Sequence, residues 1–297
     1  MKFSYLLLCL TVLLAGACHS VKVEGPTVTV PNPKPALSKA KENFTLKKMT
    51  SADLPGVLGG IIQSDSWIIY KDKQQEEFQG NVSYENDRYT FRSDYALSDR
   101  ARNLFSARGQ VFLQQREEDG SFYQAQAPQA RYNYQTQKGE LNGQGKTPVT
   151  LVYQNAKAQT TTATAQKVTF DLAQKIYILQ NNVRVEHPTP QGIQIITARK
   201  ATFRQAQNYA LLEGHATVTD HKRTLQAQTI IYDGENNSSY AYGDRALATG
   251  TTEQGTFAII ADKVQSDNEG KQINLDGQVQ GWLVSPKIND AAFNTKF

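Results

Sequence analysis

The feature that most constrains the fold of this chain is a short sequence that recurs along most of its length. Each copy places a small residue before two polar positions, an apolar position, a spacer and, in most copies, an aromatic residue. A second element with Gly or Asn at its centre lies between the copies, as in LQNNVRV and LEGHATV. Seven copies of one supersecondary unit predict a repeat architecture. The clear copies begin at Ala127, Ala165, Ala198, Ala227 and Ala261, and the weaker ones at Asp65 and Ser93.

Both elements of the unit have the pattern of β-strands. Strict alternation of apolar and polar residues is typical of half-buried strands, and the richness in Val, Ile, Thr and Tyr agrees with it. Polar stretches such as DGENN and DNEGK separate the runs and predict turns. The chain is therefore predicted to be all-β, with mostly antiparallel strands. In YILQNNVRVEH the residues that share one side are Tyr177, Leu179, Asn181, Val183 and Val185.

The first strand of each unit changes its apolar side at the same place. In IQIITARKATF, Ile196 and Ala198 have one parity, whereas Ala201 and Phe203 have the other. Because side chains alternate strictly along a strand, a repeated change of parity predicts a bulge or corner there. The repeat is therefore expected to build a two-walled sheet that folds over itself.

The beginning of the chain has the layout of a secretory signal. Lys2 precedes an apolar run that ends at Leu14, and small residues lead from there to Cys18. The run is too short for a membrane-spanning helix. The sequence predicts a signal peptide over 1–17 and a bacterial lipobox with lipidation at Cys18, although Ala15 stands where that pattern prefers Leu. The alternative is a plain signal peptide without lipidation.

A tether and a tail are expected to flank the folded part. Four prolines between residues 26 and 35 favour extended backbone and disfavour helix and sheet. We therefore expect a lipid-anchored flexible tether over 18–60. The last residues, 286–297, follow Pro286 and are expected to form a C-terminal tail.

Residues suited to catalysis or metal binding are not grouped in this sequence. His215 and His221 have no third ligand at a suitable spacing. Neither a nucleophile with a placed base nor a phosphate-binding glycine loop is found. The net charge of +4 is far from a nucleic-acid-binding signature. We therefore expect a binding protein with no catalytic residues, no metal, no cofactor and no nucleic-acid partner.

The inward side of the predicted sheet suggests what is bound. If the central Gly and Asn residues point inward, they leave an apolar slot that can take hydrocarbon chains, and each buried methylene contributes about 0.8 kcal/mol. The alternative is that these small residues relieve crowding where two twisted sheets approach, or mark bulges. The predicted lipid-binding residues are Phe170, Leu179, Val183, Phe203, Leu212, Val218, Tyr232, Leu275 and Val279.

The units resemble those of the OstA-like lipopolysaccharide-export family, which includes the periplasmic bridge proteins LptA and LptC. Stretches such as ITARKATFRQAQNYALLEGHATV share an Ala-[Asp/Arg]-Lys-[Val/Ala] strand, a turn and a Leu-x-Gly-x-[Val/Ala] strand with that family. The resemblance covers about residues 65–284. It implies an open, twisted β-jellyroll whose interior carries the acyl chains of lipid A.

The resemblance also implies a role and partners. The protein is expected to be a non-enzymatic periplasmic component that relays lipopolysaccharide from the inner-membrane ABC exporter towards the outer membrane. Its partners would include other Lpt-type jellyroll proteins, joined by edge-strand addition. Because the chain is longer than one such jellyroll, an LptC-like part over 61–150 and an LptA-like part over 151–285 are expected.

Two points differ from the family or stay open. Membrane-anchored members have a spanning helix, whereas the anchor expected here is the lipid on Cys18, and the sequence does not fix which membrane holds it. The competing interpretation is a structural or adhesive β-repeat envelope lipoprotein, with a solid core and no lipid cargo.

Overall fold

The computed structural model describes residues 60–189, 192–236, 238–252, 255–267 and 272–284. The predicted signal peptide, Cys18, the tail and all but the last residue of the tether lie outside the described residues. Within the described ranges, no helix has both the length and the apolar content to cross a bilayer.

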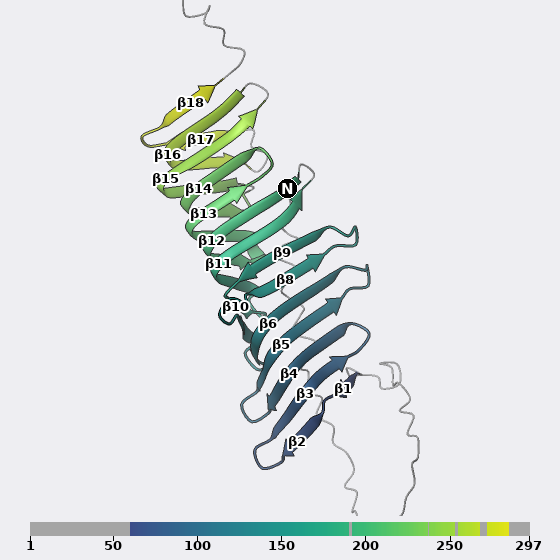
Figure 1. Ribbon diagram of the computed structural model, residues 1–297. Coiled ribbons are helices and arrows are strands. Elements are labelled where there is room, and N and C mark those ends of the chain that lie inside the picture. Colours follow the sequence, from purple (N-terminus) through teal and green to yellow (C-terminus); the bar gives the residue numbers. More distant parts are fainter. Residues whose placement is uncertain (1–59, 190–191, 237, 253–254, 268–271, 285–297) are drawn as a thin grey trace, which may run out of the picture.

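The described strands join in one antiparallel sheet of 18 strands (Figure 1). One 3-10 turn, η1 (Gln205–Gln207), interrupts the succession. The prediction of an all-β, mostly antiparallel fold built from repeats is therefore confirmed. The strands in chain order are β1 (Ile61–Gln63), β2 (Ser66–Tyr70), β3 (Gln75–Glu85), β4 (Tyr89–Asp99), β5 (Leu104–Arg116), β6 (Phe122–Asn133), β7 (Lys138–Asn142), β8 (Val149–Gln154), β9 (Thr160–Ala165), β10 (Lys167–Asp171), β11 (Ile176–Thr189), β12 (Gly192–Arg204), β13 (Tyr209–Thr219), β14 (Arg223–Asp233), β15 (Ser238–Thr252), β16 (Gly255–Asp267), β17 (Ile273–Asp276) and β18 (Gln280–Val284).

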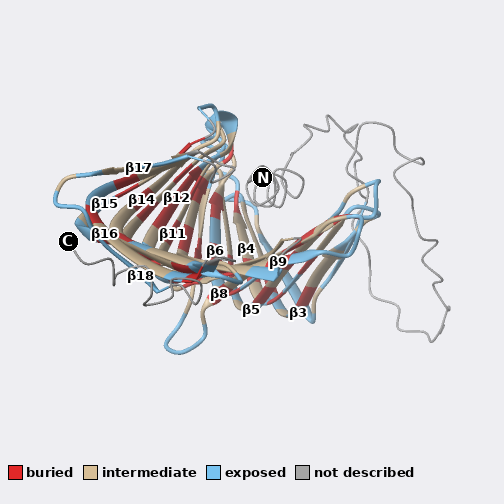
Figure 2. Ribbon diagram, turned by 90° about the horizontal axis from the view of Figure 1, so that it is seen from above, coloured by how far each residue is buried: buried red, intermediate tan, exposed pale blue. Residues whose placement is uncertain are grey.

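Long strands cross a corner near their centres, so the single sheet has two walls (Figure 2). Wall A contains β2, β7, β10 and β17, and wall B contains β1, β8, β9 and β18, together with the halves of the long strands that pair with them. For example, β6 pairs with β7 on wall A and with β8 on wall B. In the same way β11 pairs with β10 and β9, and β16 with β17 and β18. Hydrogen bonding thus continues along both walls.

The corner is built by successive residues with positive φ on alternate strands. At these places two or three residues of the bent strand stand opposite one residue of the neighbouring strand, so the pairing register shifts there. The predicted change of parity is confirmed, since Ala198 and Ala201 are both buried on either side of the slip. The corner groups are Gly80–Asn81, Gly109–Gln110, Asn181–Asn182, Gly214–His215, Gly243–Arg245 and Gly277–Gln278.

The central glycines serve this corner and do not leave an inward slot. Gly214 has φ +82°, and a Cβ added to it would lie 2.6 Å from Cβ of Arg199 on the neighbouring strand. At Gly109 an added Cβ would meet the side chain of Asp94 in the same way. Asn181, expected on the inward side, is exposed at the corner. The slot interpretation of these small residues is wrong, and the alternative of a bulge is right.

The same neighbours correct the alignment of the first repeat. Asp65 lies against Gly80 as Asp94 lies against Gly109. Since Asp94 is the second residue of its copy, the first copy begins at Ser64, one residue before the position expected from the sequence.

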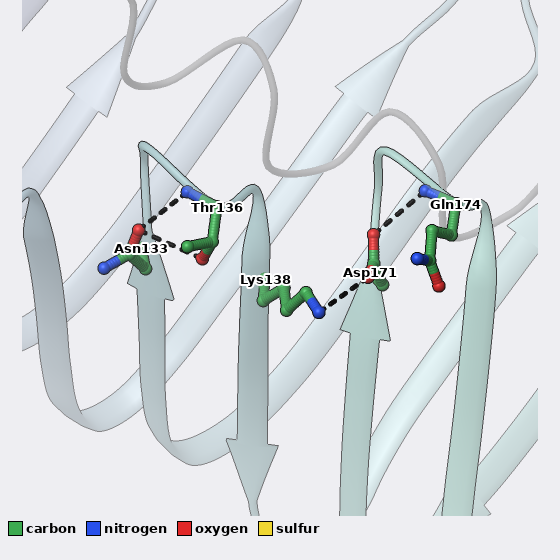
Figure 3. Close-up of polar contacts among 5 residues, drawn as sticks. All are labelled: Asn133, Thr136, Lys138, Asp171 and Gln174. Atoms are coloured by element: carbon green, nitrogen blue, oxygen red, sulfur yellow. Dashed lines mark hydrogen bonds and ion pairs between the residues drawn. The ribbon is translucent and has the colours of Figure 1, made fainter.

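Hairpin turns at the free ends of both walls are closed in the same way, by an Asn or Asp side chain that accepts a hydrogen bond from a backbone N–H of the turn. The Asn133 side-chain oxygen accepts a hydrogen bond from the Thr136 N–H at 2.8 Å, and Asp171 accepts one from the Gln174 N–H at 2.9 Å (Figure 3). Lys138 Nζ also lies 3.1 Å from the Asp171 carboxylate. Such side chains stand in for a backbone turn, which explains the polar Asn- and Asp-containing connections. Equivalent acceptors are Asn86, Asp99, Asn155, Asp220 and Asp233.

Apolar side chains from both walls point into the space between them. Val149 and Val185 on wall B and Val168 on wall A have no exposed surface. Tyr123 and Tyr153 stack on wall B with ring centroids 4.9 Å apart. The expected division after residue 150 falls within β8 and stays a prediction.

Candidate functional site

A cavity of about 330 Å³ lies between the two walls in the region of β3 to β6. This volume is at the lower end of the roughly 300–1,000 Å³ typical of small-molecule sites. The cavity is largely apolar. Its wall A side is lined by Phe78, Ala96, Phe105 and Tyr132, and its wall B side by Val82, Phe91 and Leu113.

The corner explains why these residues meet inside. On β4, Phe91 points inward from wall B and Ala96 points inward from wall A, although their positions differ in parity. The slip between Arg92 and Tyr95 makes both orientations compatible with one strand. The bend therefore turns each long strand into two linings of the same cavity.

Aromatic rings form the frame of the cavity. Phe91 on wall B meets Phe105 on wall A edge to face, with centroids 5.4 Å apart and the planes at 72°. On wall A, Tyr132 stacks near Phe170 at 6.2 Å. Gly139 lies beside Phe170 on the adjacent strand, and a Cβ there would collide with this ring. Rigid rings with few rotamers give the cavity a defined shape.

Polar and charged groups lie where wall A ends. Arg100 and Glu76 form an ion pair there, and Ser98 and Asn103 also line this end of the cavity. Asn103 Nδ2 donates to Gln135 Oε1 at 3.3 Å. The site therefore combines an apolar interior with a charged rim, which suits a ligand that has a hydrocarbon part and a polar part.

The Asp99 carboxylate, beside the rim residues Ser98 and Arg100 but not part of the cavity lining, is held in its ionised form. A hydrogen bond from the Gln75 amide, 2.7 Å long, lowers the pKa of Asp99 below its usual value, and the Arg102 N–H adds to this although burial opposes it. The Asp99 side chain thus fixes the turn and joins β3 to β4 at neutral pH.

Metal-ligating side chains are not clustered among the described residues. Searching them for three or more His, Cys, Asp or Glu side chains that are placed to hold a metal ion finds no such group. His187 Nδ1 lies 2.9 Å from Thr161 Oγ1, and burial lowers the pKa of this histidine. The pair links β9 to β11 on wall B, away from the cavity lining.

The nine predicted lipid-binding residues fall into three groups. Phe170, Leu179, Val183, Phe203 and Leu212 are buried between the walls. Val218, Tyr232 and Leu275 are partly buried against the same core. Val279 is 48% exposed. Phe170 lines the cavity described above, and the other eight residues do not contribute to it.

Sequence reasoning missed the residues of the cavity that precede the clear repeats. Phe78, Phe91 and Phe105 belong to units in which the repeated pattern is weak. The available signal was the density of aromatic residues on the inward parity of β3 to β6, since aromatic rings dominate apolar sites.

Both ends of the sheet expose apolar edge strands. Trp67 on β2 is 52% exposed and packs on Phe78 at 5.1 Å, and Trp282 on β18 is 54% exposed. A strand at the edge of a sheet also has unpaired backbone groups on its outer side. The other exposed apolar residues of these ends are Ile61, Ile62, Ile68, Ile69, Ile273, Val279, Leu283 and Val284.

Comparison with protein-family models gives no match, and comparison with curated proteins gives none either. Among solved structures the chain is similar to LptH from Pseudomonas aeruginosa, described as the LptA homologous periplasmic component of the lipopolysaccharide transport device. The aligned parts are 12% identical, with a TM-score of 0.21, and they cover 49% of this chain and 76% of that one.

Proposed function

We propose that the protein is a non-enzymatic component of the bacterial periplasm that binds lipopolysaccharide by its acyl chains. In this role it relays lipopolysaccharide from the inner-membrane ABC exporter towards the outer membrane. The observation that carries the proposal is the apolar cavity between two bent walls, with the Arg100–Glu76 pair at its rim.

Burial of acyl chains supplies the affinity in this proposal. Each methylene moved from water into the apolar interior contributes about 0.8 kcal/mol. Micromolar binding, about 8 kcal/mol, on top of an association cost of at least about 4 kcal/mol therefore needs about fifteen buried methylenes. Arg100 keeps most of its guanidinium exposed beside Glu76, and a headgroup phosphate can accept its remaining N–H donors.

The inward face beyond the cavity is the proposed path of the lipid. Phe203 and Leu212 lie further along the same interior, between the same two walls. Eight of the nine residues predicted from the sequence, all but the exposed Val279, are therefore proposed to guide acyl chains towards β17. The cavity at β3 to β6 is proposed as the place where a chain is held.

The exposed edge strands are the proposed contacts with partners. Other Lpt-type jellyroll proteins would add a strand to β1 and β2 at one end and to β17 and β18 at the other, which satisfies unpaired backbone groups and covers apolar side chains. A lipid on Cys18 is the proposed membrane anchor.

Filling the cavity tests this function. Ala96 lines it from wall A, and Ala96→Phe places a ring where an acyl chain would lie. We expect purified mature protein to bind lipid A, and this variant to lose at least about tenfold in affinity. The measurement is displacement of a fluorescent lipid A analogue, with circular dichroism to verify the fold.

Leu97→Phe is the matched control. Leu97 is the next residue on β4, points to the outer face and does not line the cavity. It adds the same ring, so its affinity should equal that of the unmodified chain. Undiminished binding by a folded Ala96→Phe variant contradicts the proposal.

A further inference from the structure

A second, larger hollow lies on the outer side of the same strands. This outer groove has a volume of about 1,250 Å³ and follows the corner from β3 to the β7–β8 connection. Its side chains have the parity opposite to that of the cavity: Arg92 and Phe112 point outward, whereas their neighbours Phe91 and Leu113 point inward. The groove is therefore separated from the lipid cavity by the sheet.

Two cross-strand rows of similar chemistry flank the corner. On wall B, Phe112 lies directly between Arg92 of β4 and Gln126 of β6. On wall A, Arg108 of β5 lies directly between Tyr95 of β4 and Gln129 of β6. Each row thus offers one aromatic ring, one guanidinium and one amide on three adjacent strands.

Both arginines are held by the rings beside them. The Arg108 guanidinium lies 4.1 Å from the centre of the Tyr95 ring, and that of Arg92 lies 5.8 Å from the Phe112 ring. Neither arginine forms an ion pair at contact distance within the described part of the chain. A stacked guanidinium keeps its N–H groups in a plane from which they can donate in pairs.

The bottom of the groove is polar and has unused hydrogen-bonding groups. Asp94 and Gln110 lie at the corner between the two rows. Among the described residues, the side chains of Gln110, Gln126 and Gln129 have no hydrogen-bond partner, and all three are exposed. These amides supply both donors and acceptors to a ligand.

This composition selects a class of ligand. Small-molecule and lipid sites have few polar groups, whereas the lining of this groove includes two arginines, an aspartate and several amides. Duplex nucleic acid is bound by many cations, whereas here there are two arginines, with Asp94 in the lining and Glu77 close enough to Arg108 to attract it electrostatically. Planar amides and carboxylates beside ring faces match the vicinal hydroxyls and apolar faces of sugar rings, and two guanidinium groups match carboxylates or phosphates carried on them.

We propose that the outer groove binds an acidic oligosaccharide, with Arg92 and Arg108 recognising its anionic groups and Phe112 and Tyr95 contacting its sugar rings. The occupant is a chain and not a single sugar, because the groove spans four strands that are each about 4.8 Å apart. This inference goes beyond the proposed lipid function and does not depend on it.

Binding of labelled oligosaccharides tests the proposal. The probes are an oligogalacturonate, which carries carboxylates, a phosphorylated oligosaccharide, and a neutral cello-oligosaccharide of the same length. We expect the full mature chain to bind at least one acidic probe, more weakly as salt is raised, and to prefer it at least about tenfold over the neutral one. The double variant Arg92→Gln, Arg108→Gln should lose this preference.

Arg204→Gln provides the control, because Arg204 also stacks on a ring, that of Tyr209 at 5.5 Å, but lies outside the groove. Its binding should be unchanged. Absence of binding to both acidic probes overturns the proposal, as does equal affinity for the neutral probe or undiminished binding by the double variant. Lipid A binding is measured separately, so failure here leaves the lipid proposal standing.

Discussion

The interior of the sheet differs between its beginning and its end, although one repeat builds both. Around β3 to β6 the facing residues are rings, such as Phe78, Phe91 and Tyr132, and a cavity lies among them. From β13 to β16 alanines predominate among the buried apolar residues that are described. Those residues are Ala210, Leu212, Ala216, Ala227, Ile230, Ala241, Ala246, Ala261 and Val264.

The contrast shows that side-chain size on the inward positions decides what the repeat encloses. Rings that project from both walls meet at their edges, as Phe91 and Phe105 do, and leave space beside the contact. Alanines project less far into the interior, and Ala216, Ala241 and Ala246 have no exposed surface. The corner, in contrast, is built from successive residues with positive φ in both regions.

The largest expected effect comes from deleting one buried leucine in each region. Leu212→Ala should lower the free energy of unfolding by about 2–5 kcal/mol, because it removes a buried side chain and opens a cavity. Leu113→Ala should fall at the lower end of that range, because Leu113 already borders a cavity. Urea unfolding of both variants measures the difference. A larger loss for Leu113→Ala would contradict the distinction between the regions.

Adding a ring at equivalent repeat positions should have the next largest effect. Ala96 and Ala201 occupy the same position in their repeat copies, just after the corner, and both are buried. Ala201→Phe should destabilise the fold by about 1–3 kcal/mol through overpacking. Ala96→Phe should cost less, because the added ring enters the cavity. Thermal unfolding compares the two, and equal losses would show that the interior is equally closed throughout.

Glycine substitutions test the claim that the corner is shared. Gly109→Ala and Gly214→Ala should destabilise by similar amounts, about 2 kcal/mol, because both have positive φ and a side chain across the corner. Gly120 has φ +83° with nothing within 4 Å of an added Cβ, so Gly120→Ala should cost about 1 kcal/mol. Markedly unequal losses at Gly109 and Gly214 would mean that the two corners differ.

The smallest effect concerns pH and His187, which lies on β11 between the two regions. Burial lowers its pKa from the usual 6.5, so below pH 6.5 the unfolded state binds a proton that the folded state resists. Stability should therefore fall as the pH drops from 6.5 towards the lowered pKa. The His187→Gln variant should lack this contribution to the pH dependence of the free energy of unfolding, as measured by urea titrations at several pH values. An unchanged profile would contradict the assignment.

The corner and the strands could be predicted from sequence because they depend on local order. The parity change at Ala198 and Ala201 marks a bend wherever it occurs in a strand. The outward orientation of Asn181 could not be predicted in this way. Asn181 and the next residue both have positive φ, so side chains do not alternate there as they do in a regular strand.

The cavity could not be predicted because it depends on distances between walls. Period-two alternation identifies Phe91 and Leu212 equally as inward residues, but not which of them borders empty space. At the C-terminal edge, Val279 was predicted to point inward, yet it lies in the bend between β17 and β18 and is exposed. Edge positions lack the second neighbouring strand that completes burial.

Site-specific photocrosslinking in cells tests the central claim most directly. A photoreactive residue at Leu113 points into the cavity, and one at Gln114, the next residue of β5, points to the outer face. The account predicts a lipopolysaccharide adduct from position 113 and none from position 114. Absence of an adduct at 113, or equal adducts at both positions, would contradict a lipid-binding interior and favour a solid β-repeat scaffold.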